Sequence, residues 1–402
     1  MRHVVRTQVC VAGGGPAGMV HALLLARAGV RVTVLEKHGD FLRDFRGDTV
    51  HPSTLRVMDE LGLIDEFLRL PHTKVSRLAF DTDGTLRTFG NFSALGRLGF
   101  RQPYIALMPQ WDFLDFLAEK ASAYPEFSLI RNAEVTDVIA EGDRVVGVRT
   151  PDLEVRSDLV IGADGRKSAV RAAAGLRVGS SNSPIDVLWF RLNWRPGDPR
   201  ELVGVVRKGL MMAMIYRGDY WQVAYVMPKG ENPRDGSLQA FKDRLVAVAP
   251  NLAEHVNDLH SWDDTSQLDV RVDRLETWWR KGLLCIGDAA HAMSPVGGVG
   301  INLAVADAVG AANVLCGPLC ENRLTEAHLA KVQRRRELPA KLIQAVQVFV
   351  QNNVIEPNLA GDLSAVRVPK IVGRGPLQFI PPIVVGRGFR PEHVRTPDVH
   401  AA

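Results

Sequence analysis

The sequence predicts an α/β protein: a doubly wound, Rossmann-like nucleotide-binding domain with an inserted antiparallel-sheet domain and a C-terminal helical extension. Three observations favour this fold class. A glycine-rich turn separates a strand from a helix near the N-terminus, two later strands end in similar turns, and the region between those two strands alternates apolar and polar residues. The 402 residues, 46% of them hydrophobic, are enough to bury the core of a two-domain chain.

The first predicted element is a βαβ unit. The apolar, β-branched residues 4–12 predict a buried strand, residues 17–28 predict a helix, and residues 30–35 predict a second buried strand. Parallel strands need a crossover connection, and such sheets bind ligands at the carboxyl ends of their strands. A ligand site is therefore expected where the first strand meets the helix.

The glycine-rich turn after the first strand has a physical role. Gly13 permits a tight turn, Gly15 lets a pyrophosphate approach the backbone, and Gly18 lets the helix pack closely on the strand. The free amides at the helix start favour an anion. Glu36, at the end of the second strand, can accept hydrogen bonds from a ribose diol and would repel a 2′-phosphate. These residues favour FAD or NAD over NADP.

Two later segments are expected to return to the same sheet. Residues 158–163 and 282–286 each predict a short buried strand, followed by a Gly/Asp turn and a helix. Asp288, in the second turn, is placed to meet a sugar-alcohol chain such as a ribityl group. Residues 295–300 then lead into a helix near Ile301, whose first amides would face the negative charge of a reduced flavin ring. These features favour FAD over NAD.

The region between those strands predicts a different kind of sheet. Residues 187–194 alternate in polarity, and residues 210–216 and 220–227 flank the turn 217–219, which predicts a hairpin in an antiparallel sheet. One face of this sheet is expected to line a substrate cavity. The candidate substrate-binding residues are Arg191, Tyr216 and Tyr225, with plain packing as the alternative for the tyrosines.

The last part of the chain predicts a helix and an extension. A helical pattern runs from Thr325 to about Val350, with a kink or break near Pro339. The arginine triplet 334–336 is expected on a solvated helix face, and residues 374–395 predict a wrapped extension with little regular structure. The expected domain limits are 1–73, 95–181 and 275–330 for the nucleotide-binding domain, 74–94 and 182–274 for the substrate-binding domain, and 331–402 for the C-terminal helix and tail.

Composition and charge argue against several classes of function. The net charge of +4, from 49 basic and 45 acidic residues without a long basic run, does not indicate a nucleic-acid-binding surface. The four cysteines have neither zinc spacing nor a disulfide framework, so a cytoplasmic protein without a metal site is expected. Strand-like residues begin close to Met1 and no apolar stretch reads as long enough to span a bilayer, so neither a signal peptide nor a membrane partner is expected.

Three fingerprints together resemble those of the FAD-dependent aromatic hydroxylases, the single-component flavoprotein monooxygenases typified by para-hydroxybenzoate hydroxylase. They are the GxGxxG turn with Glu36, the "DG" stretch from Asp164 to Arg171, and the "GD" stretch from Gly287 to Asn302, and in this order they cover the chain to about Leu315. By this resemblance the residues that bind FAD are Gly13, Gly15, Pro16, Ala17, Gly18, Glu36, Lys37, Arg46, Gln110, Asp164, Gly287, Asp288, Pro295, Gly300, Ile301 and Asn302.

The resemblance also implies a reaction. NAD(P)H, a transient co-substrate, reduces non-covalently bound FAD, the reduced flavin captures O2 as a C4a-hydroperoxide, and this species transfers one oxygen atom to a phenolic or polycyclic aromatic substrate. Pro295 and Gly297 are then the catalytic positions, beside the reacting edge of the flavin. His291 is expected to be a structural histidine of the GD turn, because flavin oxygenation requires no histidine.

Two alternatives keep the cofactor and change the function. One is an FAD-dependent dehydrogenase or oxidoreductase that inserts no oxygen, and the other is a flavin-binding sensor without turnover. The single GxGxxG turn argues against enzymes that carry a separate domain for the pyridine nucleotide. A monomer or homodimer is expected.

Overall fold

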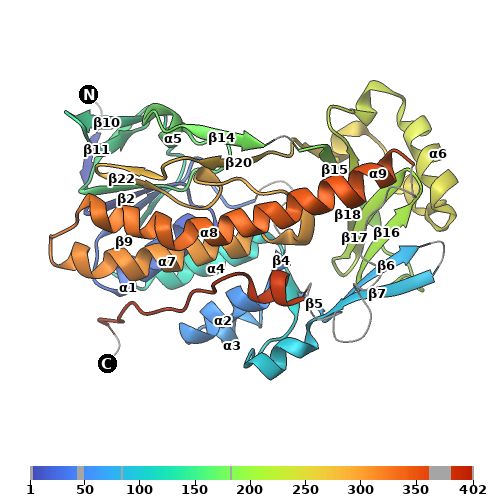
Figure 1. Ribbon diagram of the computed structural model, residues 1–402, viewed down its shortest axis with the longest axis horizontal. Coiled ribbons are helices and arrows are strands. Elements are labelled where there is room, and N and C mark those ends of the chain that lie inside the picture. The colour runs from blue at the N-terminus through green and yellow to red at the C-terminus, as the bar shows by residue number, and fades with distance from the viewer. Residues whose placement is uncertain (1–2, 43–48, 83–84, 182, 362–381, 401–402) are drawn as a thin grey trace.

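The computed structural model describes residues 3–42, 49–82, 85–181, 183–361 and 382–400, which form an elongated molecule with a sheet at each end (Figure 1). The first half is built on a six-stranded sheet in the order β21-β22-β13-β2-β3-β9. Neighbouring strands of this sheet are parallel, except that the edge strand β21 is antiparallel to β22. The strands are β2 (Val9–Ala12), β3 (Val32–Leu35), β9 (Phe127–Ile130), β13 (Leu159–Gly162), β21 (Trp279–Arg280) and β22 (Leu283–Cys285).

This parallel sheet confirms the predicted Rossmann-like α/β fold, with one correction at its start. The expected single strand over residues 4–12 is wrong, because the chain bends at Gln8 and forms two strands. β1 (His3–Arg6) pairs with β12 in a second, four-stranded sheet, in the order β1-β12-β11-β10. The other strands of that sheet are β10 (Asp137–Glu141), β11 (Arg144–Arg149) and β12 (Leu153–Arg156). Valines of the four-stranded sheet pack on Cys10 and Ala12, so a sheet covers one face of the central sheet.

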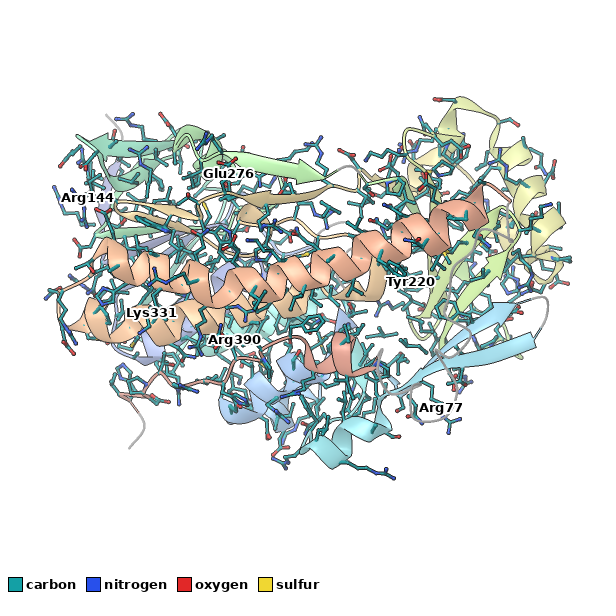
Figure 2. All side chains as sticks on the ribbon, in the orientation of Figure 1. Arg77, Arg144, Tyr220, Glu276, Lys331 and Arg390 are labelled. Carbon is teal, nitrogen blue, oxygen red and sulfur yellow. The ribbon has the colours of Figure 1, made fainter. Side chains whose placement is uncertain are left out.

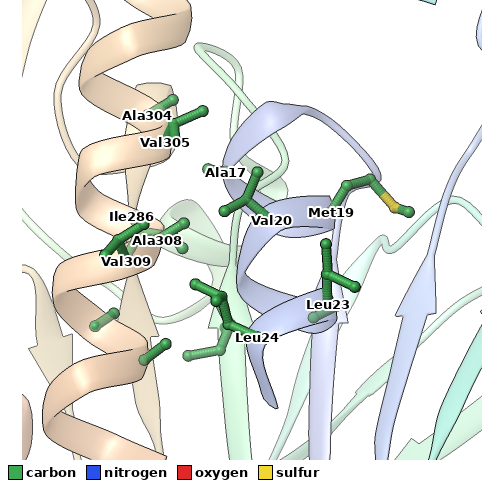
Figure 3. Packing of buried hydrophobic residues seen from close by; sticks show 14 of the residues in the cluster. Ala17, Met19, Val20, Leu23, Leu24, Ile286, Ala304, Val305, Ala308 and Val309 are labelled. Carbon is green, nitrogen blue, oxygen red and sulfur yellow. The ribbon is translucent and has the colours of Figure 1, made fainter. Parts of the chain in front are cut away.

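Helices cover the other face of the six-stranded sheet. α1 (Pro16–Arg27) packs between α4 (Gln110–Ser122) and α7 (Gly300–Cys320), and α8 (Glu326–Val350) lies outside α7 (Figure 1). Small residues make the α1–α7 contact close: Ala17 and Val20 face Ala304 and Ala308 (Figure 3). Charged side chains such as those of Glu276 and Lys331 lie on the outside of this half (Figure 2).

α7 corrects the expectation that no apolar stretch is long enough to span a bilayer. Residues Val296–Cys320 are long and apolar enough by length and composition, but 83% of their most apolar window is buried inside the protein. Their apolarity is therefore explained by packing against α1 and α8, as in the central helix of a folded core.

The second half is built on a seven-stranded sheet in the order β19-β15-β18-β17-β16-β6-β7. The predicted hairpin of β17 and β18 is confirmed. One face of the sheet is covered by α6 (Leu238–Val248), which lies on the outer side of the molecule (Figure 1). The strands are β6 (Arg77–Thr82), β7 (Thr85–Asn91), β15 (Ile185–Asn193), β16 (Leu202–Arg207), β17 (Leu210–Tyr216), β18 (Tyr220–Pro228) and β19 (Ser266–Leu268).

Two small sheets and short helices connect the halves. β14 (Val178–Ser181) and β20 (Val272–Leu275) form an antiparallel ribbon, and β4 (Thr49–Val50), β8 (Ile105–Leu107) and β5 (Thr73–Val75) form a three-stranded sheet. The short helices near these connections are α2 (Pro52–Glu60), α3 (Ile64–Phe67), η1 (Phe92–Leu98) and α5 (Ala169–Ala173).

The C-terminal part departs from two expectations. A kink or a break was expected near Pro339, and the break is wrong, because α8 continues through this buried residue. Packing along α7 holds the helix together across the missing hydrogen bond. α8 continues as a π-helical turn, η8 (Gln351–Ile355), and α9 (Glu356–Leu359). Of the predicted wrapped extension, residues 382–395 are described, and they contain one π-helical turn, η10 (Ile383–Arg387), followed by extended chain.

Candidate active site

Four features of the sequence meet at one edge of the six-stranded sheet. β22, β13, β2 and β3 are adjacent and parallel, so the turns that follow them lie side by side at their carboxyl ends. These turns carry Gly287 and Asp288, Asp164, the glycine-rich loop, and Glu36, in that order across the sheet. The tertiary structure thus brings together three fingerprints that are more than 100 residues apart in the chain.

The three glycines of the first turn have three different surroundings. A Cβ on Gly13 would lie 2.4 Å from the carbonyl oxygen of Ala163, and the residue has a φ of +103°. A Cβ on Gly18 would lie 2.0 Å from the carbonyl oxygen of Gly13. A Cβ on Gly15 would meet no atom of the described residues within 4 Å. Gly13 and Gly18 are therefore required by packing, whereas Gly15 borders open space at the start of α1.

Glu36 is buried at the end of β3, with an exposed fraction of 2%. Its Oε2 accepts the amide of Gly14 at 2.9 Å, and its Oε1 accepts the amide of His38 at 3.1 Å. These two bonds fix the carboxylate of Glu36 beside the glycine-rich loop. The neighbouring Lys37 is exposed.

Asp164 holds the DG turn in shape. Its Oδ1 accepts from the hydroxyl of Ser168 at 2.5 Å, and its Oδ2 accepts the amide of Val170 at 3.1 Å. Burial raises the pKa of Asp164 above its ordinary value, against the lowering effect of these hydrogen bonds. The Asp164 side chain therefore stabilises the conformation of the DG turn, which lies at the sheet edge where the cofactor is expected.

Asp288 of the GD turn is paired with a residue that the sequence analysis missed. Arg166 Nε donates to Asp288 Oδ2 at 3.0 Å, and both side chains are partly exposed. Arg166 directly follows the DG turn, so its position beside a fingerprint was the available signal. The preceding residue, Gly287, has a φ of +59°, and a Cβ there would lie 2.9 Å from Cβ of Ala17. The GD turn therefore lies against the start of α1.

The loop from Pro295 to Asn302 is held from its far side. Asn302 Oδ1 accepts the amide of His51 at 2.8 Å and the hydroxyl of Thr54 at 2.7 Å. Thr49 Oγ1 donates to the carbonyl oxygen of Gly298 at 2.6 Å. These contacts anchor the loop to β4 and α2, so Asn302 acts as the anchor of the loop.

The other residues of this loop leave space at the start of α7. Gly297 is exposed, with a φ of +79°, and a Cβ on Gly300 would have no neighbour within 4 Å among the residues that the structure describes. Pro295 is partly exposed and precedes the 3-10 turn Val296–Gly298, whereas Ile301 is buried in the core. Within the described parts of the chain no side chain caps the start of α7, so its first amides can bind a ligand.

Gln110 and Arg46 are the two remaining residues that were predicted to contact the cofactor. Gln110 begins α4, directly after β8, and is partly exposed. Arg46 lies outside the described residues. β8 pairs with β4, so the chain leads to Gln110 from the same small sheet that carries Thr49.

The substrate candidates lie on both faces of the seven-stranded sheet. Tyr225 is buried, and its ring packs edge-on against Phe241 of α6 at 5.2 Å. Tyr216 packs against Trp194 at 5.7 Å and is paired with Trp221, on the same outer face. Contrary to the expectation that they line the cavity, both tyrosines pack under α6.

Arg191 lies on the inner face, which points toward the six-stranded half (Figure 1). Its neighbour in β18 is Gln222, and its guanidinium carbon lies 4.6 Å from the ring centre of Tyr220. Trp189, two residues earlier, shares this face and packs against a cluster that includes Ile105 and Leu107 of β8. Trp189 Nε1 is buried and has no hydrogen-bond partner among the described residues.

A buried charge cluster behind the GD turn was also missed. His291 Nε2 lies 2.5 Å from Asp307 Oδ2, and the two side chains are 1% and 0% exposed. Arg336 Nε donates to Asp307 Oδ1 at 2.9 Å and is likewise buried, so the expectation that the arginine triplet is a solvated face is wrong for this residue. The side chain of His291 is thus buried against Asp307 of α7, and its structural role stays a prediction. The signal for the cluster was a lone aspartate within the apolar run of α7.

The residues present fit FAD. The start of α1 has no side-chain cap, borders open space at Gly15, and lies beside the fixed carboxylate of Glu36, as a pyrophosphate and a ribose require. The open, uncapped start of α7 suits the electron-rich edge of the ring. Among the described residues, no group of three or more His, Cys, Asp or Glu side chains is placed to hold a metal ion.

Comparison with known proteins agrees with this fit. Residues 6–346 match the family model described as FAD binding domain. The chain is 34% identical over 387 residues to 6-methylpretetramide 4-monooxygenase of Streptomyces rimosus, covering 92% of this chain and 90% of that protein. It is 31% identical over 326 residues to rifampicin monooxygenase of Streptomyces venezuelae, covering 75% of this chain and 62% of that protein. Among solved structures, OxyS anhydrotetracycline hydroxylase from Streptomyces rimosus has a similar fold, with a TM-score of 0.76 at 22% identity over 95% of this chain and 76% of that one.

Proposed function

We propose that the substrate of this protein is a phenolic compound with fused aromatic rings, because the chain belongs to the FAD binding domain family of flavin-dependent aromatic monooxygenases. The reaction is an NAD(P)H- and O2-dependent hydroxylation with FAD as the resident cofactor. The observation that carries the substrate class is the 34% identity, over nearly the whole chain, to a monooxygenase named for 6-methylpretetramide. The similar fold of a hydroxylase named for anhydrotetracycline supports the same class.

FAD, when bound, supplies the electron transfer from NAD(P)H and the activation of O2. The chain supplies binding and orientation. We assign the pyrophosphate to the start of α1 at Gly15, Pro16 and Ala17, the adenosine ribose to Glu36, and the ribityl chain to Asp288. Pro295, Gly297 and Gly300 then border the reacting edge of the ring, with Asn302 holding their loop.

The inner face of the seven-stranded sheet is the proposed substrate wall. Trp189 packs against β8, β8 pairs with β4, and Thr49 of β4 binds the loop at Gly298, so this face adjoins the proposed flavin edge. Trp189 Nε1 needs an acceptor, and an unpaired buried donor is costly. We assign it to an oxygen of the substrate, with Arg191 as the nearby positive charge. Apolar residues of this face would exclude water from the reacting oxygen.

One experiment tests the function and separates the alternatives. The purified protein with bound FAD is supplied with NADH or NADPH, a panel of phenolic monocyclic and fused-ring compounds, and 18O2. The proposal expects NAD(P)H oxidation that accelerates with a fused-ring phenol, and one 18O atom in the product. Substrate oxidation without 18O would identify a dehydrogenase, and FAD that neither nucleotide reduces would identify a sensor; either result overturns the proposal.

Substitution of Trp189 tests the substrate wall. Trp189→Phe keeps an aromatic ring and removes the donor, so we expect a rise in KM of about ten-fold for the accepted phenol with FAD content unchanged. Tyr225→Phe, on the outer face, is the matched control and is expected to leave KM within about two-fold. An unchanged KM in Trp189→Phe would contradict the assignment.

The proposal also covers the domain limits, the cellular compartment and the oligomeric state. The domain limits given above are supported by the pairing of β6 with β16, which draws residues 77–91 into the seven-stranded sheet. A reducing compartment such as the cytoplasm is supported by four free thiols. The proposed oligomeric state is a monomer or a homodimer, and light scattering would distinguish the two.

A further inference from the structure

A series of buried charged side chains in contact with one another runs from the proposed cofactor site to the C-terminal tail. Asp307, in the middle of α7, is 0% exposed and accepts the amide of Gly287 at 3.2 Å, in addition to its contacts with His291 and Arg336. His291 and Arg336 hold the pKa of Asp307 below its ordinary value, although burial opposes its ionisation. The GD turn is thus fixed by a charged carboxylate in the core.

Arg336 connects Asp307 of α7 to the C-terminal tail. Its Nη1 lies within 3.4 Å of Glu392 Oε1 and donates to the carbonyl oxygen of Arg390 at 3.3 Å. Arg335 donates to both oxygens of Glu392, at 2.8 and 2.6 Å. Glu392 is 5% exposed, so these groups are removed from water together with their partners. Arg390 marks this part of the tail below α8 in Figure 2.

A glycine in α7 makes room for these groups. A Cβ on Gly310 would lie 2.8 Å from Cδ of Arg336 and 3.3 Å from a carboxylate oxygen of Glu392. Glycine is unfavourable inside a helix, and α7 is a 21-residue helix. The space that the buried side chain of Arg336 occupies explains the presence of Gly310.

The tail also binds the helices whose first turns frame the site. Arg27, at the end of α1, donates to the carbonyl oxygen of Thr396 and to Asp398. Glu60, at the end of α2, accepts the amide of Val394, and Asn313 of α7 donates to the carbonyl oxygen of His393. Figure 1 shows the tail running along these helices.

We propose that Glu392 is a positioning residue for FAD, acting through Arg336 and Asp307 on the backbone of the GD turn. The tail then stabilises the cofactor site from a distance. The turn at Gly287 lies directly against Ala17 of α1, so a shift of Asp307 would reach both the ribityl and the pyrophosphate sites. The inference depends on FAD binding and not on the identity of the substrate. A failure of this inference can therefore be distinguished from a failure of the proposed substrate class.

Two glycine substitutions in α7 test the proposal. Gly310→Ala forces Arg336 to move, whereas Gly317→Ala, in the same helix, would meet no atom within 4 Å. Both raise helix propensity. The expected result is a rise of about ten-fold in the FAD dissociation constant for Gly310→Ala, measured by flavin fluorescence, and a change of less than about two-fold for Gly317→Ala.

Glu392→Gln is expected to weaken FAD binding in the same way. Its control is Asp258→Asn, which breaks a two-bond pair with Arg195 in the other half of the molecule. If Glu392→Gln and Gly310→Ala bind FAD as tightly as the unmodified chain, or if Asp258→Asn weakens binding equally for the same loss of unfolding temperature, the proposal is overturned.

A measurement on the unmodified protein does not depend on the folding of any variant. Coupling between two sites is reciprocal, so FAD binding should protect the tail. Adding FAD to the apoprotein is expected to slow amide hydrogen exchange in residues 388–396 as well as at the GD turn, and to leave residues 255–264 of the other half unchanged. Exchange in 388–396 that is the same with and without FAD would overturn the proposal.

Discussion

Arg166 and Asp288 form an ion pair, with Nε 3.0 Å from Oδ2, that joins the turn after β13 to the turn after β22. The two residues are 122 positions apart in the chain, and each directly follows or belongs to a fingerprint. The pair therefore holds two parts of the proposed ribityl site in register, before any contact with the cofactor is counted.

Breaking this pair should affect FAD more than folding. The two side chains are 26% and 31% exposed, so the ion pair itself contributes only about 0.2 to 1 kcal/mol to stability. Asp288→Ala also removes the proposed acceptor for the cofactor, and we expect the FAD dissociation constant to rise about ten-fold or more. Asp81→Asn, which breaks a similarly buried pair with Arg207 in the other half, is the control and should leave FAD affinity unchanged. Equal affinities in both variants would contradict the assignment.

Gly13 and Gly15 should respond differently to alanine. Gly13→Ala places a Cβ 2.4 Å from a backbone oxygen at a φ of +103°, so we expect a loss of several kcal/mol in the free energy of unfolding, even without FAD. The Cβ of Gly15→Ala meets no atom in the part of the chain that the structure describes, so the substitution should change the stability of the apoprotein by less than about 1 kcal/mol. Its Cβ occupies the space proposed for the pyrophosphate, so FAD binding should fall. Chemical denaturation with and without FAD separates the two effects, and tight FAD binding by Gly15→Ala would refute the placement of the pyrophosphate.

Glu36→Gln tests the ribose site. The substitution keeps the size of the side chain and removes its charge, so the amides of Gly14 and His38 lose a charged acceptor. Hydrogen bonds to a charged group are worth about 1.5 to 3 kcal/mol, and we expect FAD affinity to fall by about ten-fold to a hundred-fold. Titration of the apoprotein with FAD measures the change. Lys37→Gln, the exposed neighbour, serves as the control.

Stability should fall with acidity because of two buried histidines. Burial lowers the pKa of His21 and of His51 from 6.5 to about 4, so both are neutral in the folded protein at pH 5. The unfolded chain binds protons on these groups below pH 6.5, so the free energy of unfolding decreases as pH falls from 6.5 toward 4. Each histidine contributes a slope of up to about 1.4 kcal/mol per pH unit in that window.

His21→Gln isolates one of the two contributions. Its side chain reaches the carbonyl oxygen of Ala308 through Nδ1, and a glutamine amide preserves a donor. We expect a shallower dependence of the unfolding free energy on pH between 7.5 and 5, measured by urea denaturation at each pH. The same slope in the variant and in the unmodified protein would show that His21 is not the titrating group.

The order of elements and the cofactor turns could be predicted from local sequence. Each fingerprint needs a strand, a glycine and a helix start in succession, and these are properties of neighbouring residues, so the strands before Gly13, Asp164 and Gly287 were recognisable. The hairpin of β17 and β18 was recognisable for the same reason, since its two apolar runs flank one short turn.

Contacts between distant residues decided the rest. Whether Tyr225 faces a substrate or α6 depends on which face of the sheet α6 covers, and whether Arg336 is solvated depends on Asp307 and Glu392, which lie 29 and 56 residues away. The sequence by itself determined that the chain carries a nucleotide-binding βαβ unit with Glu36 at its second strand. Only the tertiary structure decided which charges are buried together, because the free energy of a buried charge depends on partners that the local pattern does not contain.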